Sequence, residues 1–239
     1  MAWSYERETE RFASTWGRAV FDSGGSPRRL VVNVSRSRLR TAPTVVLLVT
    51  ALLLAACGRS VASGELQGDV VDPPRPKPSF TLTDTSGERY EFAAETQGKL
   101  ALLYFGYVNC PDICPVHLAQ IAEVFDQLSE VARETEVVFV SVDPDRDSPD
   151  EIRAFLDNID SRFIGLTGTR AELDTAQNEA GVPPAIIEGD GDDYTVDHAG
   201  WVIAYAPDGL EHANYPFGTR QSTWANDLQV LAAREGGSG

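Results

Sequence analysis

LALLYFGYVNCPDICPVHL, residues 100–118, decides the fold of this chain. Its first seven residues form a continuous apolar run, which is typical of a strand buried on both faces of a sheet. Pro115 favours a helix start, and apolar residues then recur at helical spacing through residue 128. The stretch therefore predicts a central strand, a loop and a helix, with Cys110 and Cys114 on the loop and first helical turn.

Strands and helices alternate along the rest of the chain. Residues 79–84 and 89–92 flank a turn and predict a β-hairpin at the start of the domain. Further strands are predicted at 135–143, 163–167 and 200–209, and helices at 149–159, 170–180 and 220–234. This alternation predicts an α/β layered domain with a central mixed sheet flanked by helices.

The N-terminal residues 1–56 have the features of a leader. Residues 42–56 form an apolar run that follows three arginines, and the run is shorter than the roughly 20 residues of a membrane span. The four residues that end at Cys57 resemble a bacterial lipoprotein processing box, in which cleavage before the cysteine accompanies lipidation of its thiol. An uncleaved anchor helix is the alternative, and either one places the domain outside the cytoplasm.

The remaining domain boundaries follow from composition. Residues 1–30 are too long and acidic for a signal sequence and suggest a mis-assigned start codon, because Met1 is the only methionine. Residues 57–78 are rich in small, polar and proline residues and predict a lipid-anchored, flexible linker. The folded domain is expected at 79–235, held on the extracytoplasmic face of the cell membrane.

The charge of the chain narrows the choice of partners. The 239 residues carry a formal net charge of −16, and residues 57–239 hold 12 basic and 32 acidic side chains, a net charge of −20. Nucleic acid and anionic lipid headgroups are poor partners for such a surface. A cation or a basic protein patch fits it better.

The spacing of Cys110 and Cys114 leaves three uses open. A structural disulfide would close too small a loop to add much stability. A thiol-disulfide reductase more often has two residues between its cysteines, and a peroxidase of related fold would have Thr or Ser where Tyr107 stands. The third use is a metal site, because two thiolates suit copper(I), which is soft and accepts low coordination.

Three histidines are candidates for a third ligand. His198 follows an acidic loop just before a predicted strand, where it can reach a neighbouring loop and where carboxylates can orient its ring. Taken alone, this segment fits a solvated acidic turn with a chance histidine better than a ligand site. His117 lies three residues after Cys114 and fits an ordinary surface or partly buried position equally well. His212 follows a turn and is expected to be structural or solvent-facing.

Four segments together resemble the SCO/SenC family of copper proteins, which assist the assembly of cytochrome c oxidase. They are FGYVNCPDICP, VSVDPDRDSPDEIRAF, FIGLTGTRAELD and DDYTVDHAGWVIAYAPDG, and the resemblance covers roughly residues 75–235. It implies a thioredoxin-like fold and a copper ion held by Cys110, Cys114 and His198. Asn109 stands where many members have histidine, but that position is not a family ligand.

The resemblance also implies partners and a function. The family is thought to deliver copper to the binuclear copper centre of the oxidase, or to reduce the cysteines of that centre. We therefore expect a membrane-tethered copper metallochaperone that carries Cu(I) or Cu(II), with the oxidase subunit, other copper carriers and thiol reductants as partners. The rivals are a thiol-disulfide oxidoreductase and a redox sensor, which would bind its partner in one thiol state only.

Overall fold

The computed structural model of the chain describes residues 64–189, 191 and 194–234. The predicted leader at 1–56 and the predicted lipidation site Cys57 lie outside the described residues. Within the described part of the chain, no helix is both long and apolar enough to cross a membrane.

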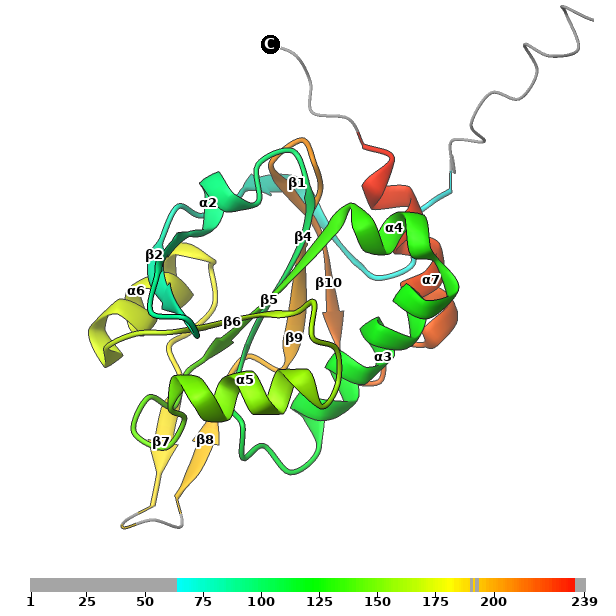
Figure 1. The fold of residues 1–239 in the computed structure, drawn as a ribbon. Helices are drawn as coiled ribbons and strands as arrows, with labels where there is room; N and C mark the ends of the chain where they lie inside the picture. Colours follow the sequence, from blue (N-terminus) through cyan, green and yellow to red (C-terminus); the bar gives the residue numbers. More distant parts are fainter. Residues whose placement is uncertain (1–63, 190, 192–193, 235–239) are drawn as a thin grey trace, which may run out of the picture. The chain divides into compact units, whose positions relative to one another are not determined.

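A mixed sheet forms the centre of the domain, as the sequence predicted (Figure 1). Its strand order is β1-β10-β9-β4-β5-β6-β2-β3, and β7 and β8 form a separate two-stranded sheet. The strands are β1 (Asp69–Pro76), β2 (Thr81–Asp84), β3 (Arg89–Glu91), β4 (Leu100–Gly106), β5 (Thr135–Ser141), β6 (Ile164–Thr167), β7 (Ile186–Glu188), β8 (Thr195–Asp197), β9 (Trp201–Tyr205) and β10 (Leu210–Pro216). Strands β4, β5 and β6 run parallel to one another, and the other pairs are antiparallel.

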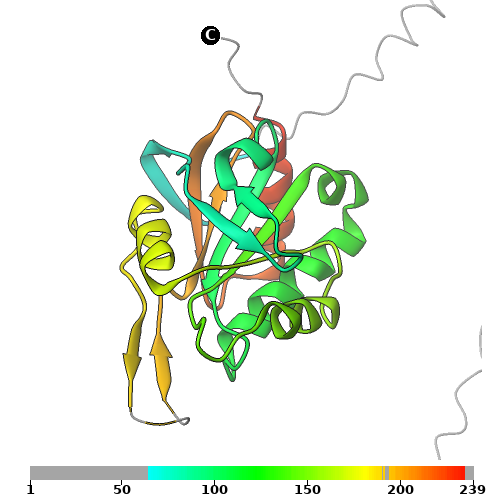
Figure 2. The ribbon, with the colours of Figure 1, turned by 60° about the vertical axis from the view of Figure 1, so that its left-hand side comes forward.

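Helices cover both faces of this sheet. They are α2 (Phe92–Glu95), α3 (Ile113–Gln127), α4 (Ser129–Arg133), α5 (Pro149–Asp157), α6 (Arg170–Glu179) and α7 (Gln221–Ala232). Helices α3, α4 and α7 contact one another, while α6 contacts β2. Figure 2 shows α6 on the opposite side of the sheet from α3 and α7. The predicted α/β architecture is confirmed.

The predicted central strand is β4, and all seven of its residues are buried. It lies between β5 and β9, so both of its edges are hydrogen-bonded. Helix α3 buries the apolar face that its sequence spacing predicted, including Leu118, Ile121 and Phe125. Capping boxes begin α5 and α6, where the side chains of Ser148 and Thr169 each accept a backbone N–H.

Strand β1 differs from the prediction, because it lies in the range assigned to the flexible linker. It pairs with β10, and Arg75 forms an ion pair with the buried carboxylate of Glu211. Its three prolines and lack of periodicity concealed it. An edge strand tolerates proline, since one of its sides needs no hydrogen bonds. Ordered structure therefore begins before residue 79.

Several short elements were not predicted from the sequence, among them α2, β7 and β8. The helix that carries Cys114 begins at Ile113, close to the predicted start near Pro115, and it ends at Gln127 because the backbone of Leu128 leaves the helical region with φ −123° and ψ 66°. A second short helix, α4, follows. Strand β10 was not predicted, because it contains polar residues, such as Glu211 and His212, that do not alternate with apolar ones. These two residues are buried in the structure.

Candidate metal centre

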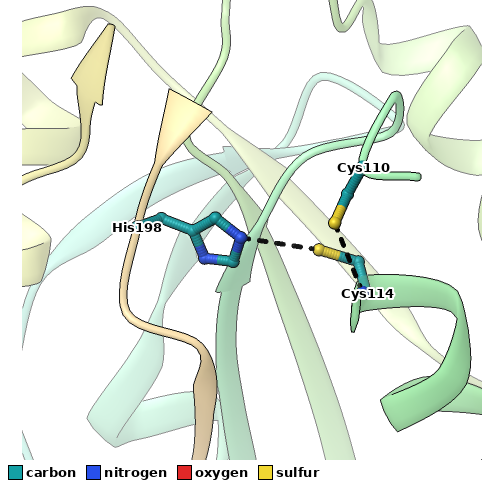
Figure 3. A group of neighbouring side chains, drawn as sticks. All are labelled: Cys110, Cys114 and His198. Atoms are coloured by element: carbon teal, nitrogen blue, oxygen red, sulfur yellow. Dashed lines mark hydrogen bonds between the residues drawn. The ribbon is translucent and has the colours of Figure 1, made fainter. Parts of the chain in front are cut away.

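Three segments of the chain bring two thiols and one imidazole together. Cys110 lies on the loop after β4, Cys114 lies in the first turn of α3, and His198 directly follows β8. The two sulfur atoms and a ring nitrogen of His198 all lie within 4.8 Å of one another. Figure 3 shows the three side chains pointing toward a common point. The structure thus brings together the three residues that the sequence analysis singled out.

The two cysteines are free thiols with different surroundings. Cys114 has no exposed surface, whereas Cys110 is 8% exposed. Cys110 lines a surface cavity together with Tyr107, Ile113 and His198. A ligand or partner that approaches through this cavity therefore meets Cys110 and His198 before Cys114.

The thiols are also electrostatically unequal. The hydrogen bond from the Cys114 side chain lowers the pKa of Cys110, and the backbone N–H groups of Cys114 and Asp112 lower it further against the effect of burial. The same sharing of one proton, together with burial, raises the pKa of Cys114. Cys110 is consequently the thiolate of the pair, as a metal ligand or a nucleophile requires.

The ring of His198 has a defined tautomer. Its Nδ1 lies 3.1 Å from the backbone oxygen of Ala199, which can only accept a hydrogen bond, so Nδ1 carries the proton. Nε2 therefore turns its lone pair toward Cys114, whose Sγ lies 3.8 Å away. The backbone carbonyl of Ala199 orients the ring. The sequence analysis had expected a carboxylate to do so.

Three residues of the β4 strand and its loop support the site. The hydroxyl of the buried Tyr104 donates to Sγ of Cys114 at 3.4 Å. The ring of Tyr107 meets that of His198 edge-on, with centroids 5.6 Å apart. A Cβ on Gly106 would lie 2.8 Å from Sγ of Cys114, so glycine is needed for the helix to approach the strand.

Sequence reasoning did not single out Tyr104 and Gly106 as site residues. A signal for them existed, because alternate residues of a strand point to one face, and this pair stands at the end of the strand nearest the cysteines. Their contacts with Cys114 follow from that placement.

The other two histidines do not join the cluster. His117 is fully buried on α3, between the rings of Tyr104 and Phe217. His212 is buried on β10, where it bonds the carboxylate of Asp208, so its expected structural role is confirmed and a solvent-facing one is wrong.

This donor set can do two kinds of chemistry. Two sulfurs and one imidazole nitrogen are soft to borderline ligands, which suit copper(I). Bonds of about 2.0–2.3 Å, the lengths that zinc makes to such atoms, place three ligand atoms about 3.5–4 Å apart around an ion. The observed spacing needs only small adjustments to reach that geometry. The same thiol pair could also exchange with a disulfide.

Comparison with known proteins adds the family. The SCO1/SenC profile matches residues 69–233, which is more than half of the chain and includes β1. The chain belongs to the SCO1/SenC family. The start of the match at residue 69 agrees with the observed start of β1 and precedes the predicted domain boundary.

Relatives of this SCO1/SenC chain include an SCO2-like protein of Rickettsia felis, which is 34% identical over 137 residues. The aligned part covers 56% of this chain and 66% of the relative, which is just under two thirds of its length.

Two solved structures of the family share the fold. ScoI of Bradyrhizobium japonicum with copper bound is 31% identical, has a TM-score of 0.59, and is matched over 66% of this chain and 99% of its own. Apo Sco1 of Thermus thermophilus is 27% identical with a TM-score of 0.61, over 72% and 97% respectively. The thioredoxin-like fold expected from the resemblance is thereby confirmed.

Proposed function

We propose that this chain is a copper metallochaperone of the SCO type, which binds one copper(I) ion through Cys110, Cys114 and His198. The observation that carries the proposal is the clustering of two sulfurs and one ring nitrogen of His198 within 4.8 Å of one another. Because Ala199 accepts the Nδ1 proton, the Nε2 lone pair faces Sγ of Cys114 before any metal arrives. A copper-bound structure of the similar ScoI supports the choice of metal.

Copper(I) fits this donor set better than zinc does. Structural zinc sites have four protein ligands, and catalytic ones have three plus water. The cluster found among the described residues contains two cysteines and one histidine, and two of the three are buried. Copper(I) accepts two or three soft ligands, whereas copper(II) would add an oxygen ligand from solvent.

Delivery would proceed by exchange of ligands. Cys110 and His198 face the cavity, so sulfur ligands of an acceptor can bind the copper ion there before Cys114 releases it. The proposed acceptor is the copper-centre subunit of cytochrome c oxidase, and other copper carriers would load the site. If an acceptor disulfide instead takes two electrons from the thiol pair, Cys110 and Cys114 become a disulfide and lose the copper.

The place of action is proposed from the sequence alone. Cleavage before Cys57 and lipidation of its thiol would hold the domain at the extracytoplasmic face of the membrane. The mass of the mature N-terminus tests this directly. A lipidated cysteine at the first position is expected, and an intact residue 42–56 segment would indicate an uncleaved anchor.

A copper(I) competition titration on the reduced protein tests the metal site. The unaltered protein should bind one equivalent tightly. His198→Ala should weaken binding by at least the roughly 10- to 100-fold that is lost when an outer-shell partner of a ligand is removed, and the double change Cys110→Ser and Cys114→Ser should abolish it. Asp197→Asn is the matched control, because it removes a charge next to His198 and leaves all three ligands. Affinity that is indifferent to His198 would refute the three-ligand site.

A thiol-disulfide oxidoreductase is the second candidate. The unequal thiols favour it, since a thiolate that lines the surface cavity beside a fully buried thiol is the arrangement of an attacking and a resolving cysteine. A reductase should keep its rate of disulfide exchange in His198→Ala, whereas a copper carrier loses affinity. Measuring both quantities on the same variant separates the two functions.

A further inference from the structure

The loop between β5 and α5, residues 142–148, contacts both halves of the metal centre. Two of its carboxylates, Asp143 and Asp147, are almost completely buried, with 0% and 1% exposure. Buried carboxylates are costly unless they are hydrogen-bonded or paired. Their bonding partners therefore show what this loop holds in place.

Asp147 holds the segment that carries the cysteines. Its Oδ2 accepts the backbone N–H of Val108 at 2.8 Å and the hydroxyl of Ser141 at 2.6 Å. Val108 stands two residues before Cys110, on the loop that leaves β4. Asp147 thereby ties the start of the cysteine loop to the end of β5.

Asp143 and Arg146 hold the segment that carries the histidine. The hydroxyl of Tyr194 donates to Oδ1 of Asp143 at 2.5 Å, and Nε of Arg146 donates to its Oδ2 at 2.6 Å. Arg146 also donates from Nη1 to the backbone oxygen of Tyr194, and its guanidinium lies 3.6 Å from the centre of that ring. Tyr194 precedes His198 by four residues.

The histidine side of the site needs such an attachment. Strand β8, which ends directly before His198, pairs with β7 in a two-stranded sheet outside the main one. An isolated two-stranded sheet has marginal stability in water. After His198 the chain enters β9 of the main sheet, so this segment lacks support from the core on its β8 side only, whereas Cys110 and Cys114 are positioned by β4 and α3. The contacts of Asp143 and Arg146 join these two parts.

We infer that Arg146 and Asp143 are positioning residues, which set the distance between His198 and the two cysteines by fixing Tyr194 against the β5–α5 loop. Asp147 fixes the cysteine side from the same loop. The inference rests on the proposed function, because it concerns the same copper site. A site held in place before copper binds loses less conformational entropy on binding and therefore binds more tightly.

A double-mutant cycle tests this positioning role. Arg146→Gln should weaken copper(I) binding by up to about 10-fold, the lower end of the loss seen when a group that bonds a metal ligand directly is removed, because Arg146 acts through Tyr194. In the His198→Ala background the same change should have no further effect, because Arg146 acts through His198. An equal loss in both backgrounds would overturn the inference and indicate a general effect on the fold.

Two further variants keep the test decisive. Tyr194→Phe removes the hydroxyl that bonds Asp143 and retains the ring under Arg146. It should lower affinity by a smaller factor than Arg146→Gln, and it tests the positioning role by itself where Arg146→Gln does not fold. Asp147→Asn should weaken binding in both backgrounds, since it acts on the cysteine side. Arg162→Gln is the control and should not change affinity, because its partners are Asp126 and Asp160.

The outcome also separates this inference from the proposed function. If His198→Ala leaves affinity unchanged, the three-ligand copper site fails. If His198→Ala weakens binding but Arg146→Gln and Tyr194→Phe do not, only the positioning role fails. Nitrogen coupling in the copper(II) electron paramagnetic resonance spectrum, expected to diminish in Arg146→Gln, gives an independent readout of the His198 bond.

Discussion

His117 should make the stability of this protein strongly dependent on pH. Its imidazole is fully buried on α3, between the rings of Tyr104 and Phe217. Burial lowers its pKa from 6.5 to about 4, against the opposing effect of the Pro216 backbone, and the charge of His198 lowers the pKa further. The folded protein therefore keeps His117 neutral at pH values where the unfolded chain protonates it.

The magnitude and sign follow from this shift. A pKa of about 4 in place of 6.5 corresponds to at most about 3 kcal/mol, since one unit is worth about 1.4 kcal/mol. Between these two pKa values the unfolded state binds more protons than the folded state. Above pH 6.5 both states hold a neutral His117, and the free energy of unfolding is not affected by its titration. As the pH falls from 6.5 toward 4, the free energy of unfolding decreases by up to this amount.

Urea unfolding of the reduced protein at several pH values between 7.5 and 4 provides the assay. Comparison with His117→Leu cancels the other titrating groups, so the variant should gain up to about 3 kcal/mol on the unaltered protein across this range. Phe217→Ala should reduce this pH dependence. The partly exposed ring of Phe217 packs against the imidazole of His117 and separates it from water. Parallel stability curves for the unaltered protein and His117→Leu would refute the reasoning.

Three further predictions concern the site and the first strand. Gly106→Ala should lower both copper affinity and stability, the latter by about 1–3 kcal/mol, because the added Cβ would lie 2.8 Å from Sγ of Cys114; titration and urea unfolding measure the two. Iodoacetamide at pH 6 should alkylate Cys110 before Cys114, and peptide mass spectrometry showing equal rates would contradict the assigned thiolate. Arg75→Met should destabilise the fold by about 3 kcal/mol, because Glu211 would remain buried without its cation; unchanged urea unfolding would argue against a stabilising role for β1.

Some residues of the candidate site could be predicted from local sequence, one only from the family resemblance, and others not at all. The positions of Cys110 and Cys114 followed from local sequence, because a buried strand and a helix start bracket them. The assignment of His198 as their partner came from the family resemblance, since the acidic segment around it, taken alone, favoured a solvated turn. Tyr194 and Arg146 lie within two of the segments that carry the resemblance. Their contact joins residues 48 apart in the chain, so no local pattern predicts it.

The sequence by itself determined the alternation of strands and helices, the buried character of β4 and the soft donor types of the site, because these depend on spacing and side-chain chemistry within short windows. Tertiary structure decided which sulfur is exposed, how the ring of His198 is turned, and that β1 joins the sheet. These features depend on contacts between segments far apart in the chain, such as the 84 residues between Cys114 and His198. Only the packed sheet brings such segments within bonding distance.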